Sequence, residues 1–347
     1  MAGDNFSLSM SQTQTVFRLP SKRSGCDALK AASEPVPWHV RPHEVLLQIH
    51  TTTLNYRDYA IASDIYPFPA KDTLVPCSDA AGEVIEVGDA VNFLSKGDWA
   101  TINFSIENLY GPQKGRDTRL GAVLDGTLRE YIAVPAIAVI PTPKTTKLSC
   151  GQLASLVCTG TTAWNSLYGN MPLEPGQHVS FIGTGSVSIT GLILARAADK
   201  LKLAKETYGA GYTINYRNTP DWPTEANKIT HGQGVDFVFE NGGSGTIAQS
   251  VKCVAQGGII AVIGFLVQAK EMPDVTALIL GKGCIVRGTN FGPKQMTEDL
   301  VQFVCGKDLP MPVEKYFPYT PDGILDAFKF LGSGGHVGKI CIEIIAW

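Results

Sequence analysis

A glycine-rich turn between a short apolar strand and a helix constrains the fold of this chain more than any other feature. Residues 178–182 (HVSFI) are typical of a buried strand, and 187–198 are predicted to form a helix. The turn between them contains Gly183, Thr184, Gly185, Ser186, Val187 and Ser188. Glycines at such a turn let a pyrophosphate approach bare backbone N–H groups. The segment therefore predicts the start of a dinucleotide-binding unit.

The segment after this turn departs from a complete unit of that kind. Ala198 is followed directly by the lysine-rich stretch 199–205, where a second strand and an adenosine-binding side chain are expected. About ten residues are missing there, judged by the usual length of a strand and its turn. Residues that would share one face of a helix recur every three or four positions from Val187 to Tyr208, which predicts one fused helix. The alternative is a tight turn at 198–200 between two short helices. The gap is either a real deletion or a misread exon boundary.

Composition places the chain among ordinary globular proteins of more than one domain. It has 347 residues, of which 44% are hydrophobic and 18% charged, and its net charge is −3. No long run of one charge is present, which argues against nucleic acid or an anionic membrane as a partner and favours a small molecule.

The terminal and apolar segments give no sign of secretion or membrane insertion. The polar N-terminal segment lacks a secretory signal, and the longest apolar run, 257–267, is too short to cross a bilayer. Eight scattered cysteines without a Cys-x-x-Cys pair fit a reducing compartment, so we expect a cytoplasmic protein.

Two patterns of secondary structure divide the chain. The first 150 residues are rich in glycine, proline and β-branched residues, and they predict a mainly β domain with strands at 45–49, 81–87, 98–102 and 131–134. Helices and apolar strands alternate after residue 151, which predicts a doubly wound parallel sheet with strands at 179–182, 212–215, 235–240, 259–264 and 285–288 and a helix at 246–255. Helices at 294–305 and 322–331 and a strand at 339–345 complete the prediction.

Six further segments together with the glycine turn resemble the zinc-independent branch of the medium-chain dehydrogenases/reductases, the quinone oxidoreductase-like enzymes. They are LNYRD at 54–58, VPCSDAAGEV at 75–84, DGTLREY at 125–131, TGTTAW at 159–164, INYR at 214–217 and GGHVGK at 334–339. The resemblance implies an α/β plus β fold: a GroES-like catalytic domain (1–150 and 290–347) with an inserted Rossmann-type dinucleotide-binding domain (151–289). The second Rossmann strand is the part that this sequence lacks.

The resemblance also implies which residues take part in catalysis. Asn55 and Asp58 would line the nicotinamide cleft, and Tyr66 matches a tyrosine that donates a proton in related enoyl reductases. The alternative for Asn55 is an N-cap of a helix through Ala62, with Arg57 and Asp58 solvated or paired. Tyr66 has an alternative role as a packing residue in a loop.

A second group of residues is implied in cofactor binding. Thr162 resembles the threonine that approaches the nicotinamide, with a helix cap as its alternative role. The other expected cofactor contacts are the glycine turn, Tyr216, Gly264, Phe265, Gly338 and Lys339, although glycines at strand ends are also common turn residues. We expect NADP(H) ahead of NAD(H), with Arg217 as a candidate phosphate partner and the 2′-phosphate preference not fixed by the sequence.

No zinc site is expected. Zinc-dependent relatives use Cys, His and Cys as ligands, and the matching positions here are Asn55, Ser78 and Cys158. His39 and His43 are four residues apart, but nearby prolines predict a loop rather than a helical metal site.

Two classes of function remain open at this point. One is an NAD(P)H-dependent reductase that transfers a hydride to an enone, quinone or carbonyl compound. The other is a family member without redox activity that serves as a redox-neutral catalyst or as a binding partner. Loss of the region that binds adenosine favours this second class, because it would remove much of the binding energy of the cofactor. Loss of a strand would also expose a sheet edge and promote aggregation. Members of the family often form homodimers by pairing the last Rossmann strand, and in this sequence residues 285–288 match that strand.

Overall fold

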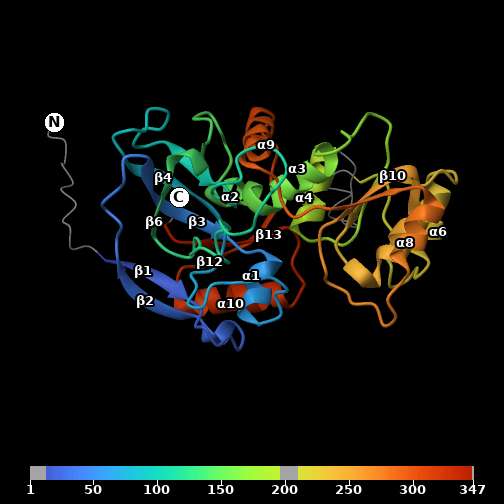
Figure 1. Cartoon of the computed structure of the whole chain (residues 1–347), viewed down its shortest axis with the longest axis horizontal. Helices are drawn as coiled ribbons and strands as arrows, with labels where there is room; N and C mark the ends of the chain where they lie inside the picture. Colours follow the sequence, from blue (N-terminus) through green and yellow to red (C-terminus); the bar gives the residue numbers. More distant parts are fainter. Residues whose placement is uncertain (1–12, 196–209, 346–347) are drawn as a thin grey trace. The chain divides into compact units, whose positions relative to one another are not determined.

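The computed structural model describes the backbone of residues 13–195 and 210–345 and all of their side chains except those of 194 and 195 (Figure 1). These residues form two compact units. Unit 1 holds the described residues up to Cys158, then Pro293–Gly335, then those from Lys339 on, and unit 2 holds Thr159–Gly292 and His336–Gly338. The expected gap after Ala198 and the expected fused helix lie outside the described residues.

A seven-stranded sheet forms the centre of unit 1. Its strands are β3 (Glu44–Thr53), β4 (Asp79–Val87), β5 (Trp99–Ile102), β6 (Tyr131–Pro135), β7 (Val139–Pro141), β12 (Val313–Pro318) and β13 (Lys339–Glu343). The order is β12-β13-β3-β4-β5-β7, and β6 also pairs with β3. Only β12 and β13 pair in parallel; the other pairs of this sheet are antiparallel.

The four strands predicted for this part of the chain are confirmed, and β3 extends beyond its predicted end to Thr53. Alternation explains the burial of β3, because side chains two residues apart share a face. Val45, Leu47 and Ile49 lie in one core cluster with residues of β4 and β5. The strand is buried along nearly its whole length, as expected at the centre of a sheet.

The described part of unit 1 has four α-helices, of which the first and the last contribute side chains to a second core cluster. They are α1 (Tyr56–Ala62), α2 (Cys150–Ser155), α9 (Lys294–Gly306) and α10 (Pro321–Gly332). α10 begins where the hydroxyl of Thr320 accepts the N–H of Gly323 and where proline occupies the first turn. Its apolar stripe, which includes Ile324 and Phe328, is fully buried. The helices predicted at 294–305 and 322–331 are confirmed to within one residue.

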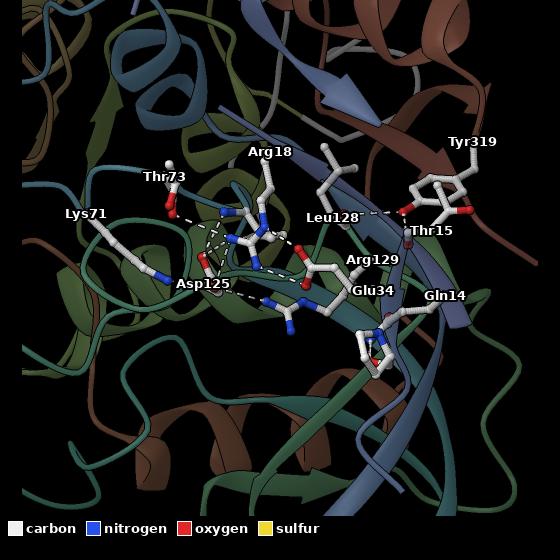
Figure 2. A network of polar contacts seen from close by, with 12 residues as sticks. Gln14, Thr15, Arg18, Glu34, Lys71, Thr73, Asp125, Leu128, Arg129 and Tyr319 are labelled. Atoms are coloured by element: carbon white, nitrogen blue, oxygen red, sulfur yellow. Dashed lines mark hydrogen bonds and ion pairs between the residues drawn. The ribbon is translucent and has the colours of Figure 1, made fainter. Parts of the chain in front are cut away.

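A two-stranded ribbon, β1 (Thr13–Arg18) and β2 (Lys30–Pro35), belongs to unit 1 and was not predicted. Figure 2 shows how a polar network fastens it: Arg18 and Lys71 converge on Asp125, with N···O distances of 3.1 and 2.8 Å. Arg18 also pairs with Glu34 of β2. Burial alone would raise the pKa of Asp125, but hydrogen bonds from Lys71, the Val75 N–H and Arg18 outweigh it and hold the pKa below its ordinary value.

Unit 2 is built on a parallel sheet of the order β11-β10-β9-β8. Its strands are β8 (Val179–Phe181), β9 (Val235–Glu240), β10 (Val254–Val262) and β11 (Ile285–Gly288). The described helices of this unit are α3 (Thr161–Tyr168), α4 (Ser186–Ala195), α6 (Trp222–Ile229), α7 (Ile247–Cys253) and α8 (Val275–Lys282). β9 and β11 match their predicted bounds, and the predicted parallel sheet is confirmed.

The strand predicted at 212–215 was wrong. This segment has no regular secondary structure, and Tyr212 is exposed. A short run with aromatic and β-branched residues fits a strand only when a neighbouring strand is there to pair with it. The prediction of a strand used local composition and had no information on that pairing.

None of the helices in the described parts of the chain has the length and apolar character needed to cross a membrane.

Candidate functional site

The start of α1 brings the first candidate residues together. Asn55 occupies the N-cap position, and its backbone N–H donates to Oδ2 of Asp58 at 2.8 Å. The carboxylate thereby satisfies an N–H group at a helix terminus, which explains why the helix begins here. The predicted N-cap position and the helix end at Ala62 are confirmed. Arg57 and Asp58 were expected to be solvated or paired; both are buried, so they are not solvated, and the charge of Arg57 acts on Asp58.

Lys339 lies at the centre of the polar cluster in unit 1. Its ammonium group donates to the carbonyl of Leu54 at 3.1 Å, to Oδ1 of Asn55 at 2.6 Å and to Oδ2 of Asp79 at 2.9 Å. Lys339 is 1% exposed and Asp79 0%. The three donors of an ammonium group are thus matched by three acceptors of the chain, as burial of a charge requires.

Of the three positions that match zinc ligands in relatives, Asn55 contacts this ammonium group, Ser78 contacts Asp79, and Cys158 is within the electrostatic influence of both Lys339 and Asp79. Ser78 donates to Oδ1 of Asp79 at 2.8 Å, and the amide nitrogen of Asn55 lies 3.5 Å from the Ser78 hydroxyl. Burial raises the pKa of the Cys158 thiol to about 12. One thiol, one hydroxyl and one amide whose oxygen already accepts from Lys339 do not form the Cys-His-Cys set of donors that zinc-dependent relatives use.

The described residues contain no group of three or more His, Cys, Asp or Glu side chains that could hold a metal ion. His39 and His43 lie in the loop before β3, as predicted.

Asp58 is the acid of this cluster with the most perturbed environment. It is fully buried, its Oδ2 accepts the Asn55 N–H, and its Oδ1 has no hydrogen-bond partner among the described residues. Burial raises the pKa of Asp58 to about 6, while the nearby positive charge of Arg57 acts in the opposite direction. The carboxyl group therefore changes charge close to neutral pH.

Arg57 is a member of the cluster that the sequence did not single out. Its Nη1 donates to the carbonyl of Leu120 at 3.0 Å, and its guanidinium carbon lies 4.6 Å from the ring centre of Phe104 and 6.0 Å from that of Tyr66. Tyr66 is half-buried and hydrogen-bonds with Arg119. The predicted proton donor therefore lies beside two guanidinium groups.

In unit 2 the glycine turn joins β8 to α4, as predicted. Gly183 has a left-handed φ of 83°, and a Cβ atom at Gly183 or Gly185 would meet no heavy atom within 4 Å. Ser186 is the first residue of α4, and its hydroxyl lies 3.0 Å from that of Thr159. The open space at these two glycines lies where a helix begins, and the first turn of a helix has N–H groups without intrahelical partners, so this turn fits a pyrophosphate.

Neighbouring residues hold this turn in place. The hydroxyl of Ser188 donates to the carbonyl of Ile182 at 3.1 Å and accepts from the Asn241 amide at 2.9 Å. Gly338 forms a parallel β-bridge with Gly185, so a segment far along the chain completes the turn. Further along α4, a Cβ atom at Gly191 would lie 2.7 Å from the rings of Phe181 and Phe239. Glycine at 191 is therefore required for α4 to pack on β8 and β9.

The other predicted cofactor contacts of unit 2 include one buried threonine, one tightly packed glycine and two exposed aromatic residues. Thr162 is buried in α3, after its first residue, and donates to the carbonyl of Asn290 at 2.9 Å, so a helix cap is not its role. A Cβ atom at Gly264 would lie 2.3 Å from the carbonyl oxygen of Asn241, which makes glycine a packing requirement there. Phe265 and Tyr216 are exposed.

Glu240, the last residue of β9, was not among the predicted site residues, although its contacts hold the loop that follows this strand. Its buried carboxylate accepts the N–H groups of Gly242 and Gly243 at 2.7 and 2.9 Å and the hydroxyls of Thr246 and Ser250. A fully satisfied carboxylate of this kind fixes the backbone of the loop after β9.

Two family models match the sequence. Residues 41–144 match the alcohol dehydrogenase GroES-like domain, and residues 185–305 match the zinc-binding dehydrogenase model. A zinc-type alcohol dehydrogenase-like protein of Schizosaccharomyces pombe is 37% identical over 339 residues, which cover 92% of this chain and 96% of that protein. The chain belongs to the medium-chain dehydrogenase/reductase family. It is an oxidoreductase of that type, and the family binds NAD(P).

Other medium-chain dehydrogenases/reductases agree in sequence and fold. A quinone oxidoreductase-like protein 2 homolog of Nematostella vectensis is 28% identical, and the match covers 86% of this chain and 81% of that protein. The crystal structure of an NAD-dependent alcohol dehydrogenase superposes with a TM-score of 0.82 and 25% identity, covering 95% of this chain and 99% of the other. The combination of GroES-like and Rossmann-type units is thus that of the medium-chain dehydrogenase/reductase family.

Proposed function

We propose that this medium-chain dehydrogenase/reductase is a zinc-independent, NAD(P)H-dependent reductase of enones, quinones or related carbonyl compounds. The observation that carries the proposal is the ammonium group of Lys339, bonded to Asn55 and Asp79 where zinc-dependent relatives hold their metal. A carbonyl substrate in this cluster would meet hydrogen-bond donors rather than a Lewis acid. A quinone is itself a doubly conjugated enone, which links the relative in Nematostella to this substrate class.

Three residues of unit 1 would have separate roles in the reaction. Lys339 contributes only donors, so the Asn55 oxygen points toward it and the Asn55 NH₂ group is left as a donor for the substrate oxygen. Tyr66 would deliver the proton that the reduced product needs, since its hydroxyl lies beside the cationic Arg119. Asp58 would hold the start of α1, and with it Asn55, in place.

The residues of unit 2 would hold the dinucleotide, which supplies the hydride when bound. The open turn at Gly183 and Gly185 would bind the pyrophosphate. We place NADP(H) ahead of NAD(H), with the exposed Arg217 next to Tyr216 as the candidate partner of the 2′-phosphate. Thr162, Gly264, Phe265 and Gly338 are the further candidate contacts. We also propose that the protein acts in the cytoplasm.

Calorimetric titration of the purified, folded protein with NADPH and NADH in parallel is the first test, followed by turnover of a quinone and enone panel after treatment with a metal chelator. We expect saturable binding of at least one dinucleotide and turnover that the chelator does not lower. Absence of binding by a well-folded sample would favour a redox-neutral or partner-binding role instead.

A further inference from the structure

An anchored stretch of backbone carries Asn241 at the carboxyl end of β9, beside the glycine turn that follows β8. Open α/β sheets bind ligands at this edge. The carbonyl of Asn241 accepts the N–H of Leu266 at 3.3 Å. On the other side, the buried carboxylate of Glu240 accepts the N–H groups of Gly242 and Gly243. The side chain of Asn241 therefore extends from a backbone that is held before and after it.

The amide of Asn241 joins the two ends of the glycine turn. Its nitrogen donates to the carbonyl of Ile182, just before the turn, and to the hydroxyl of Ser188, at its end, each at 2.9 Å. The NH₂ group of an asparagine has two donors, so both are used here. Ser188 is buried and donates to the same Ile182 carbonyl at 3.1 Å. The three groups are thus bonded to one another.

These bonds fix the direction of a backbone donor in the turn. The C=O of Ile182 and the N–H of Gly183 belong to one planar trans peptide unit and point in opposite directions. Because Ser188 and Asn241 hold the carbonyl, the N–H of Gly183 points away from them. Ser188 also belongs to the first turn of α4, whose N–H groups would face a pyrophosphate. The contacts of Asn241 therefore control how this turn presents its donors.

We propose that Asn241 is a positioning residue for the cofactor: its amide, acting through Ser188 and the Ile182 carbonyl, orients the backbone donors that bind the pyrophosphate. This inference rests on the function proposed above, in which the glycine turn binds the dinucleotide. Asn241 itself is assigned no contact with the cofactor. Substitutions at Asn241 and Ser188 should therefore have overlapping effects on cofactor affinity.

Calorimetric titration of the full-length protein, with whichever of NADPH and NADH binds the wild type more tightly, tests the proposal. We expect Asn241→Ala and Asn241→Asp each to raise the Kd about tenfold or more, as the loss of two hydrogen bonds from the turn implies. Asn241→Asp keeps the shape of the side chain, and Asn241→Ala removes the donors without adding a charge. If only Asn241→Asp weakens binding, the cause is charge repulsion and the proposal is wrong.

Asn227 provides the matched control. It lies in α6 of the same unit, and its amide also donates to a backbone carbonyl, that of Lys252 at 3.3 Å. Asn227→Ala and Asn227→Asp should leave the Kd unchanged. If they weaken binding as much as the substitutions at Asn241 do, or if the Asn241 variants bind as tightly as the wild type, the inference fails while dinucleotide binding stands. If the wild type binds neither dinucleotide, the proposed function fails and this inference fails with it.

A double-mutant cycle and steady-state kinetics separate positioning from a general loss of packing. If Asn241 acts through Ser188, Asn241→Ala should weaken binding much less in the Ser188→Ala background than in the wild type. KM for the cofactor should rise, while kcat at saturating cofactor changes by less than about twofold. Additive effects in the cycle, or a loss confined to kcat, would refute the proposal. Thermal melting establishes that each variant is folded, and Asn241→Asp decides if Asn241→Ala is not.

Discussion

The ammonium nitrogen of Lys339 lies 2.9 Å from Oδ2 of Asp79, which joins the first residue of β13 to the first residue of β4 across the buried face of unit 1. β3 lies between these two strands in the sheet, and the pair therefore spans it. A buried ion pair with every donor satisfied fixes the relative register of three strands and places the Asn55 amide at the same time.

Removing the cation of this pair should strongly lower the stability of the folded protein. Lys339→Met is expected to lower the free energy of unfolding by about 3 to 5 kcal/mol, because it leaves the buried charge of Asp79 without a partner. The double variant Lys339→Met/Asp79→Leu should recover part of that loss. Urea unfolding followed by circular dichroism measures both. Lys147→Met, which breaks an exposed ion pair with Asp308, is the control and should have no measurable effect. Equal effects of Lys339→Met and Lys147→Met would contradict this account.

Neutralising Asp58 should stabilise the protein at neutral pH. The folded protein retains the proton of Asp58 up to about pH 6, whereas the unfolded chain releases it near pH 4, so this carboxylate destabilises the fold as the pH rises between those values. Asp58→Asn is expected to raise the free energy of unfolding by about 1 to 3 kcal/mol at pH 7 and to have little effect at pH 4. Urea unfolding at pH 4, 5, 6 and 7 tests this, and a constant difference across the series would show that the cause is not titration.

A methyl group at the glycine turn should weaken cofactor binding and leave the stability of the fold unchanged. Gly185→Ala meets no atom within 4 Å, so the melting temperature is expected to stay close to that of the wild type. If a pyrophosphate approaches the backbone here, the same methyl group should weaken NADPH binding about tenfold or more in a calorimetric titration. Gly281→Ala in α8, which also has open space, is the control and should leave binding unchanged. Unaltered affinity of Gly185→Ala would place the pyrophosphate elsewhere.

We also propose a homodimer that pairs β11 of two subunits. β11 ends the described order of its sheet, and the Thr289 N–H donates to Val262 of β10, so by alternation the N–H of Val286 points away from β10. Val286→Pro should remove that outward donor, retain the sheet and convert a dimer to a monomer in size-exclusion chromatography with light scattering. Ile285→Val is the control. A wild type that is monomeric, or a Val286→Pro variant that stays dimeric, would refute pairing through this strand.

Much of the fold follows from local sequence. β9 (VDFVFE) is rich in valine and phenylalanine, β11 (IVRG) begins with two β-branched residues, and both were predicted to the residue. The β1–β2 ribbon was missed because Thr13–Arg18 has the sequence TQTVFR, in which only two adjacent side chains are apolar. What stabilises this ribbon is the contact of Arg18 with Asp125, more than 100 residues away, which no local pattern contains.

The same distinction applies to the candidate site. Asn55 and Asp58 are three residues apart on one helix terminus, so their contact was predictable from spacing. The contact of Lys339 with Asn55 depends on the pairing of β13 with β3, and only the sheet order provides it. A signal was present nonetheless, since a lysine begins the apolar strand KICIE, where a charge needs a partner. Arg57 gave no such signal within the polar segment NYRD.

The split of unit 1 into distant segments has a consequence for how the protein is made. β3 and β4 leave the ribosome about 290 and 250 residues before β13, which occupies the place between β3 and β12. At roughly 5–20 residues per second this interval is on the order of tens of seconds. During that time the part of β3 that pairs with β13, Thr51–Thr53, is uncovered on that edge and Asp79 lacks the Lys339 ammonium group, so synthesis of β13, rather than emergence of the N-terminal strands, completes the folding of unit 1.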